Sequence, residues 1–73
     1  SIYYRKEVIT MTYKHKFILT TKQGEKMELA TCGDLITANF LADHFTRLYD
    51  NGDFTVTYSH GRNIQTLTSI ERK

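Results

Sequence analysis

Apolar and polar residues alternate strictly along Ile9–Leu19, and this pattern restricts the fold of the chain more than any other. Apolar or aromatic side chains, with His15 among them, occupy every second position, and mainly threonine and lysine lie between them. Because successive side chains of a strand point to opposite faces, the pattern predicts a long strand with one buried and one exposed face.

A turn and a returning strand are expected directly after this strand. Gly24, in the segment TTKQGEK, suits the left-handed conformation of a tight turn, and EKMELAT then returns with apolar residues. In the register that this turn favours, Leu19 faces Met27, and Phe17 faces Leu29. Both arms of the hairpin then present apolar side chains on the same face.

A helix is expected over residues 34–50. Asp34 is a favourable N-cap, with Thr31 as the alternative, and Asn51 and Gly52 lie where a left-handed residue ends a helix. At 100° per residue, seven apolar residues share one broad face, which we expect to pack on a sheet. They are Leu35, Ala38, Leu41, Ala42, Phe45, Leu48 and Tyr49.

Two further apolar residues, Ile36 and Phe40, interrupt the polar side of this helix one turn apart. Either they are isolated exposed residues, or the N-terminal arm covers them, or they meet a partner. We predict a partner-binding surface centred on Phe40, with Asp43 and Arg47 at its rim.

A second hairpin is expected over residues 53–72, with its turn in SHGRN. Alternation in DFTVTYS predicts its first strand. Ile64 and Ile70 share one phase of the last strand, whereas Leu67 has the other phase. This conflict predicts a bulge or a strand with two different environments.

The predicted order of elements, β-β-α-β-β, favours an α+β fold in which one helix covers one face of a small antiparallel four-stranded sheet. A chain of 73 residues allows one core, so residues 1–73 are assigned to a single domain whose first hairpin spans residues 11–31. Residues 1–10 are either an N-terminal arm or, since MTYKHKF is itself a plausible start, a leader or an added sequence.

Composition favours a soluble, cytoplasmic protein. Cys32 is the single cysteine of the sequence, so no disulfide forms within one chain. No apolar run reaches the roughly 20 residues that cross a bilayer, and no membrane partner is expected. The formal charge of +2 is too small to indicate nucleic acid by itself.

The exposed face of the sheet is a second candidate surface. Lys14, Lys16 and Lys26 on this face, with Arg62 in the turn of the second hairpin, are suited to phosphate contacts. Three tyrosines are candidates for stacking on bases: Tyr3, Tyr4 and Tyr58. Because threonine and lysine also suit a solvated sheet face, nucleic-acid binding is the alternative hypothesis.

No residue pattern predicts catalysis, a metal site or a cofactor. The three histidines and Cys32 lack the short spacing that places metal ligands on one local scaffold. His60 beside Arg62 is the local candidate for acid–base chemistry, but no partner acid is identified. His15 is expected to be a partly buried histidine bonded to backbone, and Cys32 a cap-region cysteine unless the helix dipole lowers its thiol pKa.

The expected function is therefore protein binding without catalysis, by a chain that also associates with itself as a homodimer. In size and lack of motifs the chain resembles, in a general way, the small proteins with which phages and mobile elements bind and block host enzymes. An inhibitor or accessory role belongs to this expectation, although no motif supports it.

Overall fold

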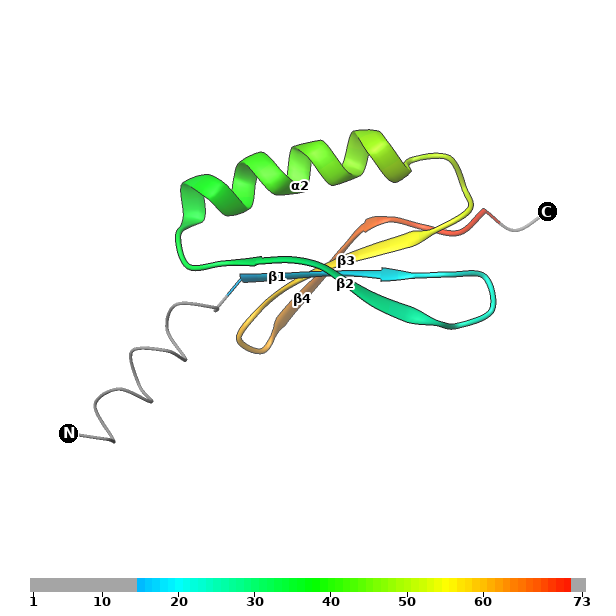
Figure 1. Cartoon of the computed structure of the whole chain (residues 1–73), viewed down its shortest axis with the longest axis horizontal. Coiled ribbons are helices and arrows are strands. Elements are labelled where there is room, and N and C mark those ends of the chain that lie inside the picture. The colour runs from blue at the N-terminus through cyan, green and yellow to red at the C-terminus, as the bar shows by residue number, and fades with distance from the viewer. Residues whose placement is uncertain (1–14, 72–73) are drawn as a thin grey trace.

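The computed structural model describes residues 15–71, which form an antiparallel four-stranded sheet with one helix across one face, as the sequence predicts. The elements are β1 (His15–Thr20), β2 (Lys26–Cys32), α2 (Leu35–Tyr49), β3 (Thr55–His60) and β4 (Asn63–Thr68). The strands lie in the order β2-β1-β3-β4. Because β1 lies between the parallel strands β2 and β3, the connection through α2 crosses one face of the sheet (Figure 1).

The turn of the first hairpin forms as expected. Gly24 has a φ of 88°, and the N–H of Thr21 donates to the carbonyl of Glu25 over 2.9 Å. Leu19 faces Met27, which confirms the predicted register next to the turn. The part of the predicted strand before His15 lies outside the described residues.

Farther from the turn, a bulge changes this register. Phe17 faces Ala30, so the predicted pairing of Phe17 with Leu29 is wrong. The pairing shifts between Phe17 and Ile18 because β2 contains one extra residue there. The prediction assumed that the two strands pair residue by residue, and such regular pairing cannot accommodate an extra residue in one strand.

The core is packed around Phe17, whose side chain is fully buried. Its ring centroid lies 5.4 Å from that of Phe45 in α2 and 5.2 Å from that of Tyr58 in β3. Leu19, Ala38 and Val56 complete the buried cluster, together with Phe17 and Phe45. This buried cluster therefore joins the helix to the two central strands.

Leu35 and Leu48 do not join this core, and their predicted burial is wrong. Their exposed fractions are 60% and 54%. At 100° per residue, they lie about 70° to either side of the direction set by Ala38 and Phe45. A single helix on a sheet buries the centre of its apolar stripe, and these two residues lie at its margins.

Both ends of α2 follow the prediction. The Asp34 carboxylate accepts the backbone N–H of Thr37 at 2.8 Å, so Asp34, and not Thr31, is the N-cap. After the helix, Gly52 has a φ of 82°, and its carbonyl accepts the N–H of Glu71 at 2.9 Å. This last bond ties the segment after β4 to the end of the helix.

The second hairpin contains the bulge that the phases of Ile64 and Leu67 predict. Val56 faces Thr68, but the next residue, Thr57, faces Thr66, so Leu67 is the extra residue. Leu67 packs against the core from this position. The bulge therefore lets Leu67 reach the core while Ile64 stays exposed on the other face.

Thr68, next to this bulge, is buried and makes two hydrogen bonds through its hydroxyl. The oxygen accepts the N–H of Val56 at 3.1 Å, and the hydroxyl donates to the carbonyl of Phe54 at 3.2 Å. One side chain thus supplies bonds at the point where the regular pairing of β3 and β4 is interrupted.

We expect Thr68→Val to lower the free energy of unfolding by about 1–3 kcal/mol, because valine keeps the volume but removes both hydrogen bonds. Urea unfolding of the full chain measures this change. Thr66→Val alters an exposed residue of the same strand and is the matched control, with an expected change within about 0.5 kcal/mol. Equal losses in the two variants would contradict the role assigned to the Thr68 hydroxyl.

Asp34 gives a prediction about pH. The hydrogen bonds from Thr37 hold the pKa of its carboxyl below the ordinary value of 3.8. A lowered folded-state pKa stabilises the protein above the ordinary value, and this contribution is lost as the pH falls through the lowered value. Asp34→Ala should therefore lower Tm at pH 7, and its difference from the wild type should shrink at an acidic pH below that ordinary value.

Thermal unfolding followed by circular dichroism measures this difference. Asp43→Ala removes a carboxylate from the middle of the same helix and serves as the control, with a smaller loss of Tm at pH 7. The role of Asp34 as a cap would be refuted by a difference in Tm that is the same at both pH values.

Candidate functional site

The outer face of α2 carries the four residues that the sequence predicts as a partner-binding surface. Ile36 and Phe40 are 83% and 77% exposed, and they lie on the side of the helix that faces away from the sheet. One turn farther on, the Asp43 carboxylate lies 3.3 Å from Nε of Arg47. The four side chains form one stripe, apolar in its first half and charged in its second.

The Asp43–Arg47 ion pair contributes little to the stability of the fold. Both side chains are mostly exposed, and an exposed pair of this spacing is screened by water and salt. The pair is therefore free to rearrange toward a partner. It also prevents a net charge from building up beside the apolar half of the stripe.

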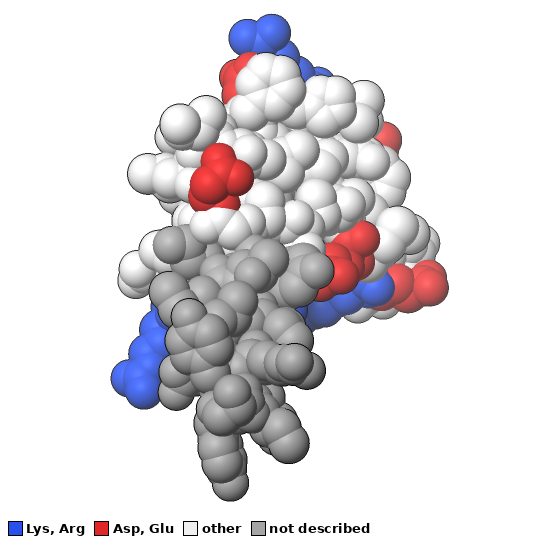
Figure 2. Space-filling view, turned by 60° about the vertical axis from the view of Figure 1, so that its left-hand side comes forward, with Lys and Arg blue, Asp and Glu red and all other residues white. Residues whose placement is uncertain are grey.

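The apolar surface of α2 is wider than the sequence suggests. Leu35 and Leu48, expected in the core, are exposed on the flanks of the helix. The space-filling view of the side on which α2 begins shows a largely uncharged upper surface, with isolated acidic side chains on it and a basic side chain beside an acidic one at its top (Figure 2). Periodicity alone does not identify these two leucines as exposed, because it gives the direction of a side chain and not the width of the sheet beneath it.

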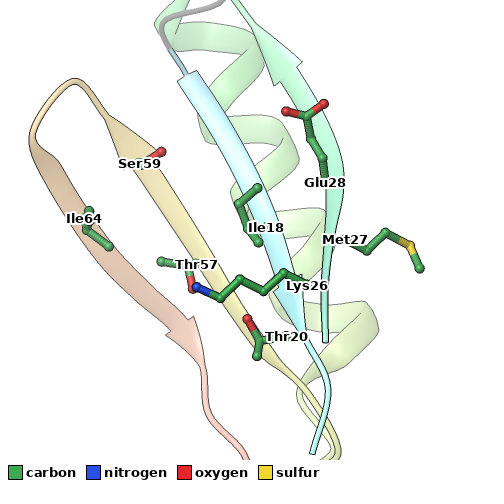
Figure 3. A pocket seen from close by; sticks show the side chains of 8 residues that line it. All are labelled: Ile18, Thr20, Lys26, Met27, Glu28, Thr57, Ser59 and Ile64. Atoms are coloured by element: carbon green, nitrogen blue, oxygen red, sulfur yellow. The ribbon is translucent and has the colours of Figure 1, made fainter. Parts of the chain in front are cut away.

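The face of the sheet opposite α2, called the uncovered face because none of residues 15–71 packs over it, contains a shallow depression of about 470 Å³. Its lining includes two isoleucines, Ile18 from β1 and Ile64 from β4, among hydroxyl and charged side chains (Figure 3). Lys26 extends across β1 toward Thr57, whereas Met27 points off the outer edge of β2. The sequence does not predict that Ile64 is exposed. It indicates only that Ile64 and Leu67 point to opposite faces of a regular strand, so that one of the two would lie outside the core.

The structure does not gather the predicted nucleic-acid-binding residues into one site. Lys16 lies 3.8 Å from the carboxylate of Glu28. Lys26 pairs with Thr20 at one end of β1, whereas Arg62 lies in the β3–β4 turn beyond the opposite end. Lys14 is outside the described residues. The basic side chains that can be placed are therefore separated, and one of them is paired.

Tyr58 is turned away from the uncovered face. Its hydroxyl lies 2.7 Å from Nδ1 of the buried His15, and its ring contacts that of Phe17. The suggestion that Tyr58 stacks on bases is therefore wrong, because the ring serves the core. His15 is more deeply buried than expected, and its Nδ1 bonds to the Tyr58 side chain. Tyr3 and Tyr4 lie outside the described residues.

Strand pairing brings together three groups that lie far apart in the sequence. Cys32 and His60 are the neighbours of His15 on either side, in β2 and β3. The imidazole rings of His15 and His60 stack with centroids 4.5 Å apart. Within residues 15–71, no group of three or more histidine, cysteine or acidic side chains is arranged to hold a metal ion.

Cys32 is not an activated thiol. Burial, with the charge of Asp34 as the second cause, raises the pKa of its thiol above the ordinary value of 9.0. Its Sγ lies 3.7 Å from the backbone carbonyl of Asp34. The alternative that the helix dipole lowers this pKa is therefore wrong, and the cysteine is held in the protonated, poorly nucleophilic form.

None of the helices in the described part of the chain has the length and apolar character needed to cross a bilayer. No protein-family model, curated protein or solved structure matches the sequence. The surfaces of the molecule are therefore the basis for inferring its function.

Proposed function

We propose that this protein is a small binding protein, not an enzyme, and that it contacts another protein through the outer face of α2. One observation supports this most directly: Ile36 and Phe40 remain exposed although the opposite side of the same helix already forms the core contact. Apolar residues without a packing role in the monomer are the usual anchors of a protein interface.

The stripe on α2 matches the way in which an amphipathic helix enters an apolar groove. Anchors at positions i and i+4 insert into such a groove, and later turns on the same side reach its rim. Ile36 and Phe40 have the spacing of the anchors, while Asp43 and Arg47 occupy the rim positions. The partner therefore presents a hydrophobic groove bordered by charged groups that can pair with a carboxylate and a guanidinium.

The fold suits this mode of binding because the helix does not need to form on contact. Its N-cap and its packing on β1 and β3 hold the anchors in place before the partner arrives, which reduces the entropy lost on binding. A protein that occupies a groove in this way would act as an inhibitor or accessory factor of its partner.

Nucleic-acid binding by the sheet is the less favoured function. A binding surface for single strands combines cations with aromatic rings that stack on bases. In residues 15–71, the tyrosines and phenylalanines lie on α2 or pack against the core, and Lys16 is paired with Glu28. The described part of the uncovered sheet face therefore lacks a stacking platform.

We expect Phe40→Asp to abolish partner binding while leaving the protein folded, because it places a charge in the apolar half of the stripe at an exposed site. The wild-type chain and the variant are immobilised and exposed to the same cell extract, and the bound proteins are compared by mass spectrometry. Asn39→Asp introduces the same charge at the adjacent exposed position and is the matched control.

A partner of the α2 face should be retained by the wild type and by Asn39→Asp, and lost from Phe40→Asp. Circular dichroism confirms that all three proteins are folded. If folded Phe40→Asp retains the same partners at the same yield, the site is not on this face.

A further inference from the structure

The uncovered face of the sheet is hollowed over β3, which lies between β1 and β4. Ile18 of β1 pairs with Thr57 of β3, and Ile64 of β4 pairs with Ser59 of β3. The shorter hydroxyl side chains of β3 therefore lie between two isoleucines, one on each neighbouring strand (Figure 3). This difference in side-chain length explains the depression of about 470 Å³. Its volume lies within the range of roughly 300–1,000 Å³ that is usual for small-molecule sites.

The β3 side of this depression offers hydrogen bonds that the fold does not use. Within residues 15–71, the side chains of Thr57 and Ser59 make no hydrogen bond. The hydroxyls of Thr55 and Thr68, in the same two strands, instead accept backbone N–H groups at 3.2 and 3.1 Å. Thr57 and Ser59 therefore keep a donor and acceptor each for a molecule in the depression.

Lys26 supplies a positive charge at the depression that no acidic side chain offsets. Glu28, the acidic residue in the lining, lies 3.8 Å from Lys16. Within the described part of the chain, Lys26 itself has no ion pair. Its side chain extends across β1 toward Thr57 instead of outward from the sheet edge (Figure 3). The ammonium therefore reaches over the hollow, where it attracts an anion.

We propose that this depression binds a small organic anion with a flat apolar body. The body lies between Ile18 and Ile64, which are two strand spacings, or roughly 10 Å, apart across the sheet. A carboxylate or sulfonate at one end contacts the ammonium of Lys26 and accepts hydrogen bonds from the hydroxyls of β3. Apolar walls with a few convergent polar groups are typical of small-molecule sites.

This inference does not rest on the function proposed for α2, because the depression is on the opposite side of the sheet. The depression is shallow, so one side of the bound molecule stays in contact with water. The affinity is therefore expected to be modest and sensitive to the loss of either the charge or an apolar wall.

Two fluorescent probes that differ only in charge test the proposal with the full chain. Anilinonaphthalene sulfonate is a flat apolar anion, and phenylnaphthylamine is the same ring system without the sulfonate. The wild type should bind the anion more tightly than the neutral probe. Lys26→Gln should raise the Kd of the anion at least about fivefold and leave that of the neutral probe unchanged. Ile64→Thr keeps a β-branched side chain but shortens one wall, and it should raise both Kd values about threefold.

Two control variants show where the probes bind. Lys22→Gln removes the same charge from the turn of the first hairpin, away from the depression. Phe40→Asp alters the exposed apolar face of α2, which is the other surface that attracts such probes. Both variants should bind the two probes as the wild type does, and circular dichroism verifies that all the proteins are folded.

Three results would overturn the proposal. The first is a wild type that does not bind the anion, and the second is an equal Kd of the anion in Lys26→Gln and Lys22→Gln. The third is loss of binding in Phe40→Asp alone, which would place the probe on α2. Amide chemical shifts of the labelled wild type give an independent location, since the anion should shift Ile18, Thr57 and Ile64 more than the residues of α2.

Discussion

The contact of Phe17 with Phe45 and Tyr58 determines the architecture on which the other features depend. Phe17 lies on β1, which has a neighbouring strand on each side, and its ring touches both α2 and β3. This one side chain therefore connects the first hairpin, the helix and the second hairpin. Within residues 15–71 the core contains five buried apolar residues, so each large ring in it contributes a substantial share of the hydrophobic stabilisation.

The two bulges follow from building such a core on one face of the sheet. The central pair, β1 and β3, is regular over its described length, whereas each outer strand contains one extra residue where it pairs with a central strand. Leu29 and Leu67 both pack against the core. In each outer strand the extra residue of the bulge is thus an apolar residue that packs toward the helix. The backbone of the strand bends at the bulge as a result.

Local patterns predicted much of this fold. Alternation before Leu19, the turn at Gly24 and the cap at Asp34 each involve residues close in sequence, and the described part of each forms as expected. The sequence did not reveal the pairing of β1 with β3 or the exposure of Leu35 and Leu48, because these depend on contacts between distant segments. The exposure of Ile36 and Phe40 could be predicted because the side chains of a helix follow one regular period. Residues on the side opposite the core-facing residues therefore point to water.

A one-sided core also determines where interactions with other molecules can form. The sheet face under α2 and the inner side of the helix are occupied by the core, whereas within residues 15–71 nothing packs on the outer side of α2, the uncovered sheet face or the outer sheet edges. The contact proposed for α2 uses the first of these regions. Because the core already holds the helix from its inner side, a partner can occupy the outer side without displacing any contact of the fold.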